Sequence, residues 1–407
     1  MQNKTHQKNT VRYYALLLAL LSFLFFSGDL GMIDVQKTAI VMAVGVDKQD
    51  EQFIVTSQIA IPKPSKQGQS SQTVQIVSRG KTVADAFEEI NAKTGWYPKL
   101  VFCRLILLGE KTVQSDVFDA LDFFLLDEYL SDNCLIAACE TTATELLNTT
   151  ALVDSAGALA MEKVLSSHAE RVGLVLPATL RTFSIGYFSD AQSSYLPVLK
   201  TQPQQESVGS TENKPTAQSE NQEKQGEQNG GTQQPEEQKP VFSASETALF
   251  VRGKRVGTLT KEETFALSAV RSHLKLAAYS VTTDESACTL NIKNNKVKSK
   301  LRVGKDGTPT LSINIRLTAG LLDYAKALPL LQTKDAGDIP SGAFFAAERA
   351  LLAHLTTAFE KCKSSGCDLF KIRDRLQKFD KKNYKKYKDS ALSACILDAD
   401  IRLVSLR

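Results

Sequence analysis

Residues 39–61 read AIVMAVGVDKQDEQFIVTSQIAI: two apolar stretches, rich in β-branched residues, on either side of the charged segment DKQDE. Apolar runs of this length that flank a polar turn predict a β-hairpin. In the second run Phe53, Val55, Ile59 and Ile61 recur at even spacing and line one face of the expected strand. The folded part of the chain therefore begins with a sheet, and no catalytic motif accompanies it.

The segments that follow alternate between helical and strand patterns. Residues 81–95, KTVADAFEEINAKTG, predict a helix that starts at Thr82 with Asp85 in a capping-box-like position and ends at Gly95. Residues 115–130 predict a second helix, capped by Ser115. KLVFCRLILLG at 99–109 and DNCLIAACE at 132–140 are nearly continuous apolar runs, which are typical of strands buried on both faces.

The alternation of strand and helix patterns resumes after residue 240. ALFVRGKRVGTLT at 248–260 predicts a hairpin, and Thr260 with Glu263 predicts a capped helix behind it. Strand patterns at 287–320 precede a long amphipathic helix at 342–363, a basic helix at 368–388 and a final strand at 394–406. We expect an α+β fold built from mainly antiparallel or mixed sheets with helices packed on them.

Composition divides the chain into four regions. Residues 202–240 are dominated by Gln, Glu, Asn, Ser and Gly, with Val208 and Ala217 as the apolar exceptions, and predict a disordered Gln-rich linker. This leaves a leader at 1–32, an N-terminal region at 33–201 that we expect to hold two subdomains, and a C-terminal domain at 241–407.

The leader predicts attachment to a membrane with the body on the outer side. Lys4, Lys8 and Arg12 precede a run of fourteen uncharged residues, 13–26, which is short for a spanning helix of about 20 residues. We favour an uncleaved anchor, since no small-residue cleavage site follows, but a cleaved signal peptide is the alternative. The anchor residues would be Tyr13, Leu17, Leu20, Phe23 and Phe26.

Nothing in the sequence indicates catalysis or a cofactor. The four histidines are separated, no hydrolase, metalloprotease or phosphate-loop motif occurs, and we expect no metal. Seven cysteines in a body of this size do not make a disulfide framework. A bridge between Cys362 and Cys367 is geometrically possible, and buried free thiols are the alternative.

Two basic stretches stand out against a near-neutral chain of net charge +4, which gives no reason to expect a nucleic-acid partner. The first decorates the strands at 293–302. The second covers the basic helix. Its lysines and arginines either contact anionic lipid headgroups or form an ordinary solvated face, and the sequence leaves both interpretations open. The candidate residues for membrane-surface contact are Lys371, Arg373, Arg375, Lys378, Lys382 and Lys386.

The order of these segments resembles a known family. AIVMAVGVDKQDEQFIVTSQIAIP, GKTVADAFEEINAKTG, KLVFCRLILLGE and FDALDFFLLDEYLSDNCLIAACE are similar to the N-terminal region of the C subunit of GerA-type spore germinant receptors, the GerAC-like or Ger(x)C family. TALFVRGKRVGTLTKEET, NNKVKSKLRVGKDGTPTLSINIRLTAGLLD and CDLFKIRDRLQKF are similar to its C-terminal region.

The resemblance implies a non-enzymatic, membrane-tethered, extracytoplasmic body of about three small domains at the inner membrane of a bacterial spore. It implies two integral-membrane partner subunits, a polytopic transporter-like B-type subunit and an A-type subunit, in a complex that senses small-molecule germinants. The family's lipidated cysteine before the first strand is missing from FFSGDLGMID, and its Pro and Trp near the C-terminus are missing from KKNYKKYK.

Two other classes of function remain as alternatives. An exported cell-envelope hydrolase would need a converging site, for example Cys103 beside a histidine in a concave pocket. A polyanion-binding envelope protein would need the two basic stretches to merge into one surface.

Overall fold

The computed structural model describes residues 13–22, 38–61, 72–149, 157–202, 241–282, 287–305, 307–324 and 341–405. The α+β class is confirmed, with helices laid on two sheets among these residues. Residues 203–240 of the Gln-rich stretch and the anchor residues Phe23 and Phe26 lie outside the described residues, whereas Gln202, the first residue of that stretch, belongs to a strand.

The larger sheet has ten strands and gathers chain from both expected regions. Its main path runs β10-β9-β8-β6-β5-β1-β2-β3, with β4 beside β1 and β7 beside β6. Its strands are β1 (Thr38–Gln49), β2 (Gln52–Ile61), β3 (Gln72–Gly80), β4 (Tyr97–Lys99), β5 (Leu105–Leu108), β6 (Leu135–Cys139), β7 (Ala178–Thr179), β8 (Ser193–Gln202), β9 (Val241–Val251) and β10 (Lys254–Leu259).

The centre of this sheet is parallel and buried on both faces. β1, β5, β6 and β8 pair in parallel, and all four residues of β5 are buried. Ile106 and Leu108 pack into the core on one face, whereas Leu105 and Leu107 pack into the core on the other. Two buried faces explain why the run at 99–109 is continuously apolar, although the strand is shorter than that run.

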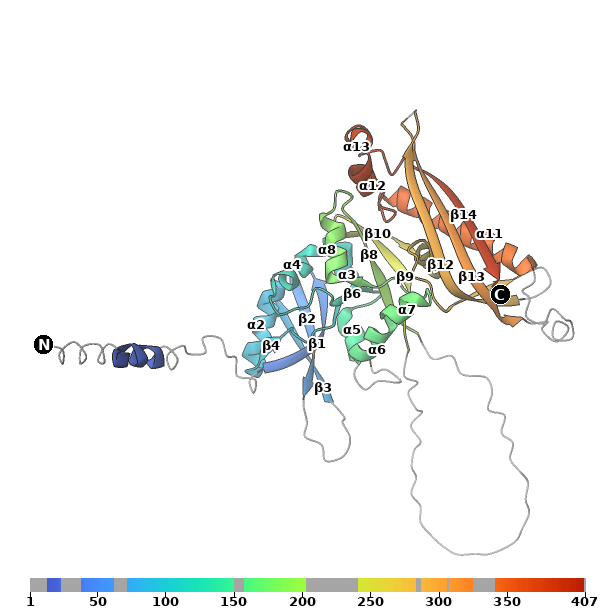
Figure 1. The fold of residues 1–407 in the computed structure, drawn as a ribbon. Helices are drawn as coiled ribbons and strands as arrows, with labels where there is room; N and C mark the ends of the chain where they lie inside the picture. Colours follow the sequence, from blue (N-terminus) through green and yellow to red (C-terminus); the bar gives the residue numbers. More distant parts are fainter. Residues whose placement is uncertain are drawn as a thin grey trace, which may run out of the picture.

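Helices cover both faces of the larger sheet (Figure 1). Residues of α2 (Val83–Thr94), α4 (Phe118–Leu126) and α8 (Leu180–Phe188) share one core, and residues of α5 (Ala143–Asn148), α6 (Gly157–Val164) and α7 (Ser167–Arg171) share the other. The predicted ends of α2 are confirmed by the Thr82 cap and the left-handed Gly95. The prediction for Ser115 is wrong: it ends α3 (Glu110–Gln114), and Asp116 accepts the Phe118 amide where α4 begins.

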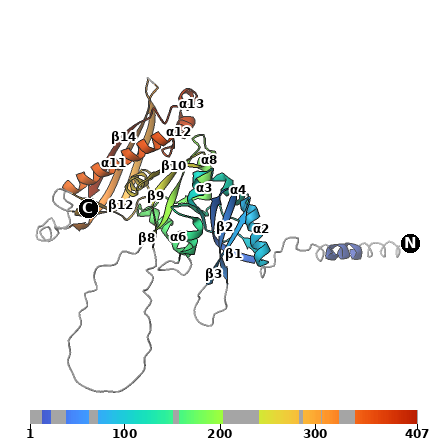
Figure 2. The same ribbon diagram turned by 180° about the vertical axis from the view of Figure 1, so that it is seen from behind.

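The smaller sheet has the order β11-β12-β13-β14, and its bounds are β11 (Ala277–Thr282), β12 (Ala287–Val303), β13 (Pro309–Tyr324) and β14 (Ile396–Ser405). The last pair is parallel. α9 (Lys261–Val270), α11 (Ser341–Ser365) and α12 (Ile372–Phe379) share its core, while α13 (Lys381–Tyr387) follows α12. Figure 2 shows α11 lying across one side of the sheet from behind.

Two sheets, where about three had been expected, result from one pairing. β8 and β9 are antiparallel neighbours from Ser193↔Val251 to Gln202↔Val241, so the chain leaves and re-enters the same sheet around residues 203–240. Leu249 and Leu259 of this sheet also lie in the core of the smaller one. The chain after residue 240 therefore completes the first sheet before it builds the second.

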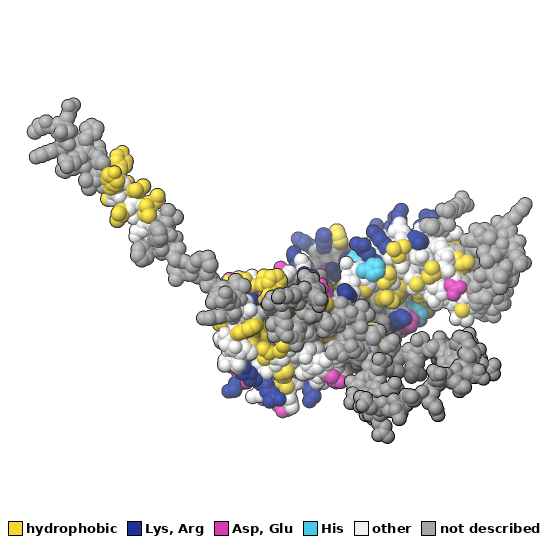
Figure 3. Space-filling view, turned by 90° about the horizontal axis from the view of Figure 1, so that it is seen from below, with side chains coloured by type: hydrophobic (Ala, Val, Ile, Leu, Met, Phe, Trp, Pro, Cys, Tyr) yellow, Lys and Arg dark blue, Asp and Glu magenta, His cyan; other side chains and the backbone are white. Residues whose placement is uncertain are grey.

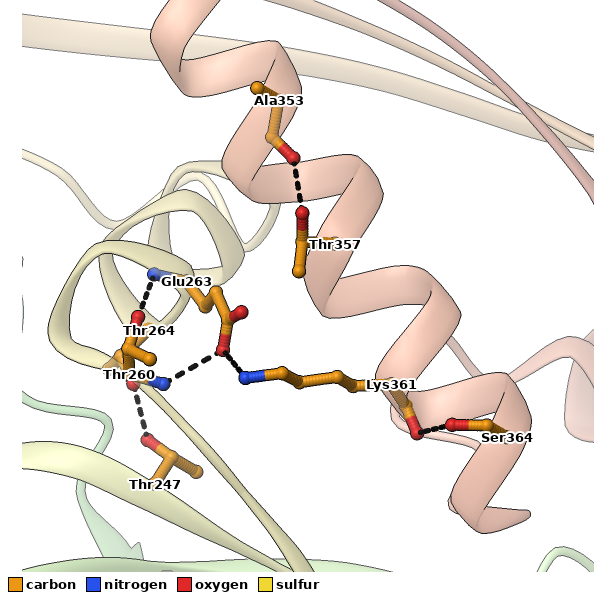
Figure 4. A network of polar contacts seen from close by, with 8 residues as sticks. All are labelled: Thr247, Thr260, Glu263, Thr264, Ala353, Thr357, Lys361 and Ser364. Atoms are coloured by element: carbon orange, nitrogen blue, oxygen red, sulfur yellow. Dashed lines mark hydrogen bonds and ion pairs between the residues drawn. The ribbon is translucent and has the colours of Figure 1, made fainter.

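A polar network fastens the two sheets at this junction (Figure 4). Glu263 on α9 is buried and accepts hydrogen bonds from the Thr260 amide at 2.8 Å and from Lys361 Nζ on α11 at 2.8 Å. On the same helix Thr264 donates to Thr247 of β9 at 3.0 Å. The predicted capping box of Thr260 and Glu263 is confirmed, and its carboxylate also holds α11 in place.

Candidate functional site

The histidines and acids do not converge in the described part of the chain, where no group of three or more His, Cys, Asp and Glu residues could hold a metal ion. His168 lies on α7 and His354 on α11. His273 Nδ1 lies 2.6 Å from Glu170 Oε1 at an exposed position. These positions bring no nucleophile to a base.

All seven cysteines are free and buried. The side-chain hydrogen bond with Cys103 and burial raise the pKa of the Cys134 thiol far above its usual value, and both cysteines line a cavity of about 440 Å³ whose lining residues include no histidine. Burial raises the pKa of Cys367 to about 12, and its thiol donates to the Phe250 carbonyl at 3.4 Å. Cys134 and Cys367 are therefore protonated near neutral pH and serve as packing groups.

The expected anchor residues fall partly within the described chain. Residues 13–22 form a helix on which Tyr13, Leu17 and Leu20 are largely exposed. Figure 3 shows apolar side chains covering this helix. Among the described residues, none of the helices combines the length and the apolar character needed to cross a membrane.

The basic segment is broken in two rather than being one helix. Asp380 ends α12 with an extended φ of −146°, and its side chain accepts the Asn383 amide at 3.2 Å to cap α13. α13 is held in place by two tyrosines: Tyr384 forms a hydrogen bond with Asp190, and the ring of Tyr387 lies against Gly307. Gly307 has a φ of 88° and no room for a Cβ, which lets the turn after β12 approach that ring.

The six candidate residues for membrane-surface contact divide into two groups. Lys371, Lys378, Lys382 and Lys386 are exposed, whereas Arg373 and Arg375 are half-buried. Arg375 Nη1 donates to Ser299 Oγ on β12 at 2.9 Å, and Arg373 Nε is buried without a hydrogen-bond partner among the described groups. The two arginines face the protein, so the exposed basic surface of this segment is made of lysines.

The two basic stretches of the sequence lie on opposite faces of the smaller sheet. Ser299 faces α12, so its neighbours at even positions point the other way. That open face carries Lys296, Lys298, Lys300 and Arg302, and it continues through Arg316 on β13 to Arg402 on β14. Figure 3 shows Lys and Arg side chains gathered along one edge of this half of the molecule.

A cavity of about 400 Å³ lies where α8 and β8 meet α9, β13 and the start of α12. Its ionisable lining residues are Arg271, His273, Asp368, Lys371, Asp374 and Arg375. Asp368 anchors this junction: its amide donates to Ser193 Oγ at 2.9 Å, and its carboxylate accepts the Ile372 and Arg373 amides at 2.9 and 2.8 Å. Burial raises the pKa of Asp368.

Sequence reasoning singled out Lys371 and Arg375 but did not predict this cavity. Its walls come from four segments far apart in the chain, and no local pattern marks such a meeting. The one sequence feature that could have indicated the cavity was the presence of isolated arginines at helix ends, such as Arg271.

Two family models of spore germination proteins together match most of the chain. The family model described as "Spore germination protein N-terminal domain" matches residues 31–201, and that described as "Spore germination B3/GerAC like, C-terminal" matches residues 245–401. No curated protein matches. Among solved structures, the "Crystal Structure of the GerBC protein" matches with a TM-score of 0.52 at 17% identity, covering 89% of this chain and 97% of that one, and so supports the same fold.

Proposed function

Because the chain belongs to the GerAC-like family of spore germination proteins, we propose that it is the non-enzymatic C-type subunit of a nutrient-germinant receptor. In this proposal it lies on the extracytoplasmic face of the spore inner membrane. The observation that carries the proposal is that family models of spore germination proteins match both halves of the body, on either side of the Gln-rich stretch.

Its partners would be two integral-membrane subunits, of the A type and the B type, and the complex would sense a small germinant. The burial of all seven cysteines, and the raised pKa of Cys367 among them, support a role in assembly rather than covalent chemistry. The leader would hold the body at the membrane.

Disrupting the gene in its spore-forming host tests the receptor role. Spores without the chain should fail to release their core solutes when a nutrient mixture is added, and they should still respond to a trigger that bypasses nutrient receptors. Covalent crosslinking of the intact complex should recover two polytopic proteins with the chain. Normal nutrient germination in the disrupted strain under every mixture would refute the proposal.

We further propose that the lysines of α12 and α13 lie close to anionic lipid. Each such charge is worth roughly 1 kcal/mol near an anionic surface, and the attraction weakens as salt rises. The body without its leader should bind vesicles that contain anionic lipid and should not bind neutral ones.

The two basic faces provide a matched control for this proposal. Replacing Lys378, Lys382 and Lys386 by Gln should abolish vesicle binding, while replacing Lys296, Lys298 and Lys300 by Gln removes the same charge from the open sheet face and should not. If instead the sheet-face variant lost binding and the helix variant kept it, the membrane contact would lie on the sheet. Equal binding to neutral and anionic vesicles would exclude a contact based on charge.

The anchor has its own test. Mass spectrometry of the mature chain should find the residues before Asp29 retained, whereas a chain starting near Asp29 would show that a signal peptide had been removed.

A further inference from the structure

The cavity between α8 and α12 has the size of a small-molecule site. Its volume of about 400 Å³ falls in the range of ligand pockets in proteins, roughly 300–1,000 Å³. Residues from the larger sheet, from α9 and from the segment 368–375 line it together, so a ligand there would touch both halves of the body.

Two arginines line this cavity, and the charge of the Asp368 carboxylate acts on one of them, Arg375. Arg271 sits at the C-terminus of α9, its guanidinium 4.3 Å from the centre of the Tyr195 ring and hydrogen-bonded to the Tyr195 hydroxyl. Arg375 donates to Ser299, and burial lowers its pKa. Within the described residues neither forms an ion pair, although each guanidinium carries five N–H donors.

The remaining charges leave the cavity positive. Lys371 adds a third cation. Asp368 accepts the Ile372 and Arg373 amides in the first turn of α12, and its charge offsets part of the positive charge of the cavity. Asp374 is the other carboxylate of the lining, and the Glu170 carboxylate outside the lining holds His273. Half-buried cations in such a setting gain most from an added anion, because water screens them less than surface charges.

Apolar groups and a constrained backbone complete the site. Ile185 is 58% exposed on α8, and Val270 and Leu369 line the same space. One lining residue, Lys371, has a positive φ of 57°, and so do two chain neighbours of lining residues, Gln192 at 45° and Ser272 at 64°. Such conformations persist where surrounding contacts fix them, and they concentrate at binding sites.

We propose that this cavity binds a small organic carboxylate with an apolar group. The carboxylate bridges Arg271 and Arg375, whose planar forks match its geometry, and the apolar group covers Ile185 and Val270. Inorganic phosphate fits less well because it leaves the apolar wall uncovered. The inference concerns binding by this chain alone and does not rest on the receptor role.

Isothermal titration of the full-length chain in detergent tests the ligand class, with 4-methylvalerate as the probe. The neutral isostere 4-methylvaleramide should bind about tenfold more weakly or worse, because it lacks the charge that the arginines pair with. Inorganic phosphate should not compete. Equal affinity for acid and amide, competition by phosphate, or no binding of the acid up to about 10 mM would overturn the proposal.

Variants test the position. Arg271→Gln and Arg375→Gln should each weaken 4-methylvalerate binding by about tenfold or more. Lys378→Gln removes an exposed charge from α12 outside the cavity and should leave the affinity unchanged. Ile185→Trp, at an exposed position of α8, should block the cavity without removing a hydrogen bond. Unfolding temperatures identify any variant that has lost its fold, and unchanged binding in Arg271→Gln, Arg375→Gln and Ile185→Trp would refute the site.

Discussion

Replacing residues 203–240 by an Asn-Gly turn should leave the fold intact and raise its stability. The pairs Thr201↔Phe242 and Gln202↔Val241 close the antiparallel ladder of β8 and β9, so the two ends of the replaced chain are hydrogen-bonded neighbours. A two-residue turn is the commonest connection for such a pair, and Asn-Gly suits its backbone.

The size of the effect follows from the entropy of closing the loop. Each halving of a flexible loop lowers the closure cost by about 0.6 kcal/mol, so going from 38 residues to two lowers it by about 2.5 kcal/mol. Intermediate loops of about 19 and about 10 residues should fall in order between the two ends.

Urea unfolding of the four chains measures this series. Far-UV circular dichroism reports on both sheets, and the fluorescence of Trp96, the single tryptophan, reports on the larger one. A steady rise in the free energy of unfolding as the loop shortens is expected. Unfolding of the shortened chains, or a loss of stability that grows with shortening, would show that the β8–β9 pairing depends on the replaced residues.

Three further outcomes follow from buried or hydrogen-bonded groups. Glu263→Gln should lower the free energy of unfolding by about 1–2 kcal/mol, which is less than for a fully buried ion pair because Lys361 is 40% exposed. A double-mutant cycle with Lys361→Met measures the coupling energy between the two side chains, and a coupling energy of zero would contradict this prediction. Burial and a hydrogen bond to Asp190 respectively raise the pKa values of Tyr279 and Tyr384 to about 12 from 10.0, so the folded chain holds these protons more tightly. The stability that these two tyrosines contribute should therefore be fully present below pH 10 and be lost between pH 10 and 12. Tyrosinate absorbance measures the titration, and a result in which every tyrosine titrates near pH 10 would contradict the prediction. The seven thiols should resist a thiol reagent at about pH 8 in the folded chain and all react in urea, since each is buried; rapid labelling of the native chain would contradict the structure.

Local chemistry in the sequence was enough to predict many elements. The hairpin of β1 and β2, the caps of α2 and α9, and the long amphipathic helix α11 are confirmed. Each depends on residues within a few positions of one another, through side-chain period or a cap, so the information is complete in the segment itself.

The tertiary structure decided which segments meet. The pairing of β9 with β8 across residues 203–240, and of β14 with β13 in parallel, depends on contacts between distant residues that no local pattern encodes. The same holds for Arg373 and Arg375: by sequence they belong to one basic stretch with Lys378, but the docking of α12 on β12 turns them inward. Periodicity fixes which side chains share a face of an element, and only the packing of that element decides whether the face meets protein or water.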